Sequence, residues 1–202
     1  MADLIAFAQK GYHMHRISIP SFLLCVFPVA GLAYCPTADD LMAGIRLTQT
    51  DPLVVSTITL SDGVYSETRL DTQRSDAPLR EMERTHFLMA PTELAPQPRT
   101  VIYQEAPDVF DRLPELGTIV SSTIYREPNL ADIAIELTLT FSGAERFEIS
   151  GCEYDVWRAE LSQVISGTTH YSHLAYAPEL GLLLALTSSS QRFSFDQIEA
   201  LE

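Results

Sequence analysis

Residues 133–141 read IAIELTLTF, and this stretch decides the expected fold class. Apolar side chains occupy every second position in it, namely Ile133, Ile135, Leu137, Leu139 and Phe141. Alanine, glutamate and threonine fill the positions between them. Because successive side chains of a β-strand point to opposite faces, this period of two predicts a strand with one face on a core and the other in water.

Similar segments lie on both sides of this strand, each bounded by turn residues. Upstream, Leu53–Leu60 and Val64–Leu70 are rich in β-branched residues and are joined by an Asp-Gly step, which is typical of a hairpin. Downstream, Gly143, Gly167 and Gly181 separate further apolar runs. Short connections favour antiparallel neighbours. We therefore expect a mainly β fold, in which about nine or ten strands form a curved antiparallel sheet, half-barrel or barrel-like.

Three local features supplement this pattern. Thr37 is a suitable N-cap, acidic residues follow it, and Gly44 is a suitable stop, so a short N-terminal helix is expected. Further along, the polar segment Asp71–Arg80 predicts a loop, and His86–Ala90 predicts a strand that precedes a proline-rich link.

The beginning of the chain has the composition of a secretory signal peptide. A basic start at residues 14–16 leads into an apolar run that closes on Gly31-Leu32-Ala33. We expect residues 1–33 to be removed, with Met14 rather than Met1 as the initiator. Residues 34–202 would then form one β-rich domain that works in the periplasm or outside the cell.

Two alternatives to cleavage stay open. The apolar run could remain as a membrane anchor, although Pro20 and Pro28 are unfavourable within a helix. Cys35 could instead carry a lipid, although the bulky Tyr34 stands where a small residue normally precedes a lipidated cysteine. Cleavage would leave a mature chain that does not span a membrane.

The mature chain would be strongly acidic. Removal of Asp3, Lys10 and Arg16 changes 27 acidic and 13 basic residues into 26 and 11, a net charge of −15. Such a charge repels nucleic acid and anionic lipid headgroups at long range. We expect no nucleic-acid partner, and the composition favours neutral, apolar or cationic ones.

The cysteine count predicts a disulfide. Cys25 would leave with the signal peptide, so Cys35 and Cys152 would remain as an even pair in an oxidising compartment. These two residues lack the C-x-x-C proximity of an exchange pair, so a structural bond is expected.

No catalytic, metal or cofactor site is assigned from the sequence. His86, His170 and His173 would survive processing, but residues three apart on a strand point to opposite faces, and zinc needs three or four ligands. The sequence contains no G-x-S-x-G nucleophile motif, phosphate-binding glycine loop or dinucleotide fingerprint. These observations favour a protein without catalytic activity.

The C-terminal part carries a resemblance to a known architecture. Tyr154-x-x-Trp157, a hairpin with a glycine turn, and Tyr176-Ala-Pro-Glu-Leu-Gly181 before an apolar strand resemble the closing hairpins of periplasmic half-β-barrel proteins. Outer-membrane lipoprotein carriers and several uncharacterised periplasmic families have that architecture. The resemblance implies a half-barrel fold with a concave apolar face.

The expected function is therefore non-catalytic binding of an apolar ligand or of an envelope protein. The expected ligand face combines the alternating strand with later apolar residues: Ile133, Ile135, Leu137, Leu139, Phe141, Trp157, Leu182 and Leu184. Two alternatives stay open, an envelope hydrolase whose histidine and acidic residues are assembled by the fold, and a structural or assembly component. The oligomeric state is also left open.

Overall fold

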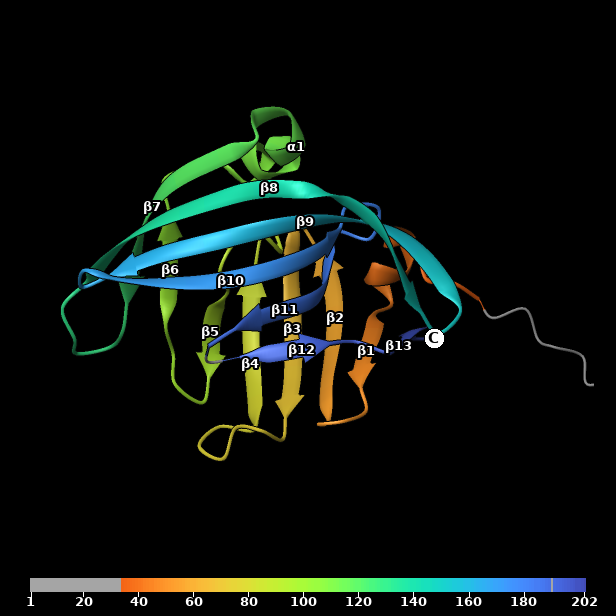
Figure 1. Cartoon of the computed structure of the whole chain (residues 1–202). Helices are drawn as coiled ribbons and strands as arrows, with labels where there is room; N and C mark the ends of the chain where they lie inside the picture. Colours follow the sequence, from red (N-terminus) through yellow and green to blue (C-terminus); the bar gives the residue numbers. More distant parts are fainter. Residues whose placement is uncertain (1–33, 190) are drawn as a thin grey trace, which may run out of the picture. The chain divides into compact units, whose positions relative to one another are not determined.

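A computed structural model of the chain describes residues 34–189 and 191–202 (Figure 1). The expected signal peptide, with its start at Met14, lies outside the described residues. Its cleavage therefore stays a prediction, and the fold below is that of the part that follows it.

The first of two antiparallel sheets contains the N-terminal strands and one strand from the C-terminus. Its strand order is β13-β1-β2-β3-β4-β5. The strands are β1 (Ile45–Gln49), β2 (Val54–Ser61), β3 (Val64–Asp71), β4 (Leu79–Arg84), β5 (Thr92–Ala95) and β13 (Gln197–Ala200).

In the second sheet, the long strands β7–β10 run across the strands of the first sheet (Figure 1). Its strand order is β12-β11-β10-β9-β8-β7-β6. The strands are β6 (Thr100–Tyr103), β7 (Thr118–Arg126), β8 (Ile133–Ile149), β9 (Cys152–Ile165), β10 (Thr168–Ala177), β11 (Leu182–Ser188) and β12 (Arg192–Ser194).

The mainly β class is confirmed, but a single curved sheet is wrong. The chain leaves the first sheet after β5 and enters the second at β6, and between these strands only Glu93 and Arg99 form a bridge. At the other side, Phe195 N donates to Leu184 O and Asp196 N donates to Thr48 O, which carries the chain back to the first sheet. The described strands therefore form two sheets and no closed barrel.

The stretch that predicted the fold lies in β8, an interior strand of the second sheet. Ile135, Leu137 and Leu139 are buried, whereas Glu136 between them is exposed, as the alternation predicted. β8 pairs with β7 on one side and with β9 on the other. A register shift near Gly143 interrupts the pairing with β9, and such bulges bend strands.

Helices are short in the described residues. The N-terminal segment forms a 3₁₀ helix, η1 (Ala38–Met42), in which Asp40 accepts a hydrogen bond from the backbone N–H of Thr37 at 2.7 Å. η2 (Pro107–Arg112) is also a 3₁₀ helix and leads into the α-helix α1 (Leu113–Leu116). None of the helices in this part of the chain has the length and apolar character needed to cross a membrane.

The predicted cysteine pair is confirmed. The sulfur atoms of Cys35 and Cys152 lie 2.06 Å apart. The bond ties the segment before η1 to the first residue of β9. The Tyr154 hydroxyl donates to Pro36 O at 3.0 Å beside it, so a covalent link and a hydrogen bond hold the same segment against the second sheet.

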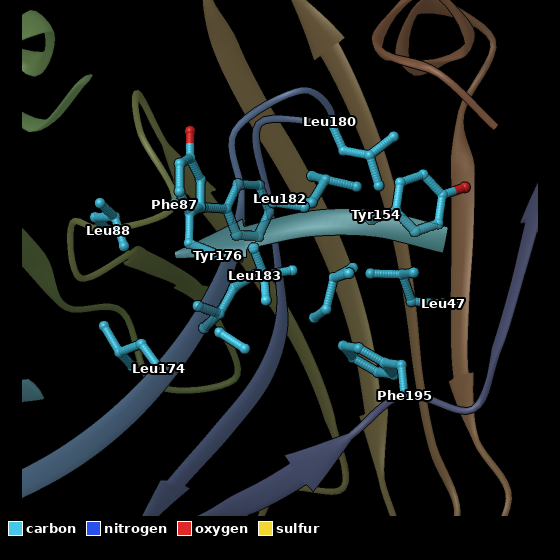
Figure 2. Close-up of a cluster of buried hydrophobic side chains, with 14 of the residues drawn as sticks. Leu47, Phe87, Leu88, Tyr154, Leu174, Tyr176, Leu180, Leu182, Leu183 and Phe195 are labelled. Atoms are coloured by element: carbon cyan, nitrogen blue, oxygen red, sulfur yellow. The ribbon is translucent and has the colours of Figure 1, made fainter. Parts of the chain in front are cut away.

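The hydrophobic core lies between the two sheets. In Figure 2, Leu47 of β1 lies near Tyr154 of β9 and near Phe195, which follows β12. Leu182 of β11 and Leu180 of the preceding turn belong to the same cluster. Burying one leucine side chain contributes roughly 1.5–3 kcal/mol, so these contacts are the main attraction between the sheets.

The expected loop over Asp71–Arg80 is confirmed for residues 72–78, whereas the expected strand at His86–Ala90 is wrong. β4 begins at Leu79 and ends at Arg84, and residues 85–91 form a loop. In this 85–91 loop the backbone N–H of Leu88 donates to Nδ1 of His86 at 3.0 Å. A side chain thus takes the place of a strand partner, which the residue preferences of the segment could not show.

Candidate functional site between the two sheets

The inner face of the first sheet is apolar on one half and charged on the other. β3 directs Glu67, Arg69 and Asp71 to the buried side, and β4 directs Arg80 to the same side. Arg84, at the end of β4, has a side chain that is only 6% exposed. Charged side chains are rarely buried unless they are paired. The burial of these side chains therefore depends on how their charges are paired.

Glu67 is shared between two guanidinium groups. Its Oε1 accepts hydrogen bonds from Ser56 Oγ at 2.8 Å and from Arg69 Nε at 2.7 Å. Its Oε2 accepts a hydrogen bond from Arg84 Nη2 at 2.5 Å. Burial alone would raise the pKa of Glu67, but the two guanidiniums and the Ser56 hydroxyl outweigh burial and hold the pKa below its ordinary value. Glu67 is therefore ionised, and one negative charge faces two positive ones.

Aromatic rings complete the surroundings of these two arginines. The guanidinium of Arg69 lies 4.5 Å from the ring centre of Phe193, and that of Arg84 lies 4.4 Å from that of Phe87. Burial, opposed by Glu67, lowers the pKa of Arg84 to about 10. Arg84 is still charged near neutral pH, so the triad of Glu67, Arg69 and Arg84 has one positive charge in excess.

Several donors in this region have no acceptor among the described residues. Arg80 pairs with Glu93 at 3.2 Å through Nη1, but its Nε and Nη2 are buried without a partner. The same holds for Nε of Arg84 and for Nε2 of Gln191. Because buried polar groups are nearly always hydrogen-bonded, such atoms indicate places where a further acceptor is favourable.

A pocket of about 210 Å³ lies where the 85–91 loop meets β9, β10 and β11. Its apolar walls come from the loop and from the second sheet, and include Phe87, Leu88, Met89, Leu161, Leu174, Leu183 and Leu186. Arg84 and Gln191 line the same pocket. Apolar walls with a few polar groups are typical of small-molecule sites.

A second hollow of about 250 Å³ adjoins this pocket. Arg84, Met89 and Ala90 line both, and Tyr103 of β6 lines the second. The backbone N–H of Ala90 donates to the Tyr103 hydroxyl, which holds the loop against the second sheet. Each of the two hollows is smaller than the roughly 300–1,000 Å³ of typical ligand pockets.

His86 holds the 85–91 loop in place through hydrogen bonds with Leu88 and Asp111. Its Nδ1 accepts the bond from Leu88, so Nε2 carries the proton and donates to Asp111 Oδ1 at 3.1 Å. The Tyr176 hydroxyl lies 3.3 Å from the same Nε2. Burial lowers the pKa of His86 even though Asp111 opposes it, so the ring is neutral near pH 7. The hydrogen-bond partners of His86 in the described residues include no serine or cysteine.

The three histidines are not brought together. His86 is buried beneath the loop, whereas His170 and His173 are exposed on β10. No group of three or more His, Cys, Asp or Glu residues in the described part of the chain is arranged to hold a metal ion. Histidine lies beside an acidic residue, as the hydrolase alternative requires, at His86 with Asp111 in the interior and at His173 with Glu160 on the surface.

The structure places the eight residues of the expected ligand face mostly in the interior. Five of them are buried: Ile135, Leu137, Leu139, Leu182 and Leu184. Phe141 and Trp157 are half-buried, and Ile133 is 44% exposed. None of the eight lines the pocket, so contact between them and a ligand stays a prediction.

On β11 the pocket is lined by Leu183 and Leu186 instead of the expected Leu182 and Leu184. Leu183 pairs with Tyr176 and Leu186 pairs with Leu174, across a register shift in β10. Both faces of β11 are buried, so its leucine run has no alternation from which the pocket side could be inferred. The charged inner face of β3 and β4 was missed for a related reason, because polar residues occupy both faces of these strands.

Comparison with known proteins found no matching family model, curated protein or solved structure. The resemblance to periplasmic half-barrel proteins therefore stays an expectation.

Proposed function

We propose that this chain is an exported protein that binds an apolar ligand without catalysing a reaction. The observation that carries the proposal is the pocket between the 85–91 loop and β9–β11, whose walls combine leucine, phenylalanine and methionine side chains with polar ones such as Gln163 and Ser172. Transfer of apolar surface from water into such walls is favourable at about 25 cal/mol per Å². Binding at this site is therefore most favourable in free energy for ligands with a large apolar surface.

The surroundings of the pocket support binding rather than chemistry. The 85–91 loop is held by the contact of His86 with Asp111 and by the bond from Ala90 to Tyr103. A wall fixed in this way loses little conformational freedom when a ligand enters. Because Nε2 of His86 already donates to Asp111, this histidine is occupied in holding the loop.

Export is supported by two independent features. The disulfide between Cys35 and Cys152 is of the kind that persists in oxidising compartments. The sequence before it has the composition of a signal peptide. Mass spectrometry of the protein secreted from its host tests this part, with an N-terminus at Tyr34 as the expected result.

Binding is tested with N-phenyl-1-naphthylamine, a neutral apolar dye whose fluorescence rises in apolar surroundings. The full chain is expected to bind the dye, and Leu186→Asn is expected to weaken binding at least about tenfold, because an unpaired amide in an apolar wall is unfavourable. Val164→Asn on β9 is the matched control, since Val164 is partly exposed and does not line the pocket.

Circular dichroism first establishes that both variants are folded. Absence of dye binding by the wild-type protein would overturn the proposal. An equal loss of affinity in the two variants would also overturn it, because the dye would then bind elsewhere.

A further inference from the structure

We propose that the ligand of this pocket ends in a carboxylate, which Arg84 and Gln191 receive at the polar end of the apolar walls. The inference rests on the proposed function and adds the chemical class of the ligand. Three observations carry it: the charge of the lining, the unpaired donors and the position of the other charged groups.

The pocket differs in charge from the rest of the chain. The protein has a net charge of −14, with 27 acidic residues. Yet the lining residues that the structure describes include no aspartate or glutamate, and Arg84 is their one charged member. Glu67 carries one negative charge and pairs with both Arg84 and Arg69, which carry two positive ones. The local excess of positive charge favours an anion, although the whole molecule repels anions at long range.

Two buried donors at the pocket lack acceptors. The Arg84 side chain is only 6% exposed, and its Nε has no acceptor among the described residues, although Nη2 is bound to Glu67. Nε2 of Gln191, which lines the same pocket, also has no acceptor among the described residues. An ionised carboxylate is an acceptor with two oxygens and can serve both donors. A hydrogen bond between an ion and a charged donor is about twice as strong as a neutral one.

The other buried charges are engaged elsewhere. Glu93 pairs with Arg80. Asp71 lies six residues from Tyr65, the strand partner of Arg84, which places it roughly 20 Å along β3 at about 3.3 Å per residue. Glu83 lines the adjoining hollow but not this pocket. Of these carboxylates, Glu67 alone contacts Arg84, and it is already shared.

The test compares decanoate with decanol, which have the same apolar chain and differ in the head. Both compete with the neutral naphthylamine dye for the full chain at pH 7.5. The wild-type protein is expected to bind decanoate at least about tenfold more tightly than decanol, because a hydrogen bond to a charged group typically contributes that much.

Two variants locate the head group. Gln191→Leu removes one donor and leaves the buried ion pairs intact, and Arg84→Lys keeps the charge beside Glu67 but has no Nε. Each is expected to reduce the preference for decanoate over decanol several-fold. Arg99→Gln is the control, because Arg99 pairs with Glu127 and lines neither hollow.

The outcomes separate the two proposals. If neither the dye nor decanol nor decanoate binds, the proposed function fails. If decanol and decanoate bind equally, or if both variants keep the wild-type preference, the carboxylate assignment fails and the apolar pocket stands. Binding of decyl phosphate more than tenfold tighter than decanoate would also overturn the carboxylate assignment in favour of a phosphate head.

Discussion

Glu67 is the residue on which the charged half of the interior depends. One carboxylate accepts hydrogen bonds from Ser56, Arg69 and Arg84, so it neutralises charge that comes from two strands. A buried ion pair often adds little net stability, but removal of one partner leaves an uncompensated charge. The sequence shows Glu67 and Arg69 two positions apart on a strand, yet the alternating threonines and serines left the direction of both side chains undecided.

Glu67→Gln should destabilise the protein by about 3–5 kcal/mol, because two buried guanidiniums lose their counter-charge. Glu199→Gln is the control, since Glu199 forms an exposed pair with Arg46 and such pairs contribute about 0–1 kcal/mol. Urea unfolding measures both free energies. Similar values for the two variants would show that Glu67 is not essential to the interior.

The burial of His86 predicts a dependence of stability on pH. Burial lowers the pKa of His86 from its ordinary value of 6.5, so below that pH the unfolded chain binds a proton that the folded chain does not. The free energy of unfolding should therefore fall as the pH drops below 6.5. His86→Gln should flatten this decline between about pH 5 and 6.5, a range in which ordinary histidines titrate.

His173→Gln provides the matched control, because His173 is exposed on β10. Urea unfolding at several pH values measures the slope for each protein. An unchanged slope in His86→Gln would mean that another group is responsible.

At the scale of elements, a loop forms one side of the pocket and regular strands form the other. β4 ends at Arg84, and the following 85–91 loop supplies one wall and the histidine that anchors it. The first part of β8, Ile133–Phe141, was predictable because its apolar residues alternate strictly, whereas the strand continues through Gly143, where the sequence indicated a break. The 85–91 loop was not predictable, because four of the five residues His86–Ala90 are apolar and the run resembles a strand. Its conformation depends on contacts with Asp111 and Tyr103.

The turn between β10 and β11 is closely packed against β3. Gly181 has a φ of +68°, and a Cβ there would collide with the Tyr65 hydroxyl. Gly167, in the preceding turn, has a φ of +81° with nothing within 4 Å of an added Cβ. Gly167→Ala should cost about 1 kcal/mol from backbone strain alone, and Gly181→Ala should cost about 1–3 kcal/mol more.

Thermal unfolding measures both effects. Adding Tyr65→Phe to Gly181→Ala should recover part of the loss, because it removes the hydroxyl that the new methyl group meets. Equal losses in the two glycine variants, with no recovery, would contradict close packing of this turn against β3.

At the scale of the whole described part, the sheets are joined by the core, by the chain crossing at β12–β13 and by the N-terminal disulfide. The disulfide links residues 117 positions apart. Its effect on stability comes mainly from the restriction of the unfolded chain, which grows with the length of the closed loop. It therefore stabilises the arrangement as a whole rather than one strand.

The double variant Cys35→Ser with Cys152→Ser should lose about 4–5 kcal/mol of unfolding free energy. Guanidinium unfolding of the wild-type protein in reductant should give the same loss, whereas reductant should leave the double variant unchanged. A wild-type protein as stable in reductant as without it would contradict this role of the disulfide.

The sequence by itself determined the β class, the strand over Ile133–Phe141 and the pairing of Cys35 with Cys152. The first two follow from local alternation, and the pairing follows from the expected loss of Cys25 with the signal peptide, which leaves two cysteines. Neither inference needs knowledge of the partner strands. Only the tertiary structure decided the division into two sheets, the inward direction of Glu67 and Arg84, and the lining of the pocket by Leu183 and Leu186. The physical reason is that such strands have polar residues, or leucines, on both faces. Which of the two faces becomes buried is then decided only by the elements that pack against the strand.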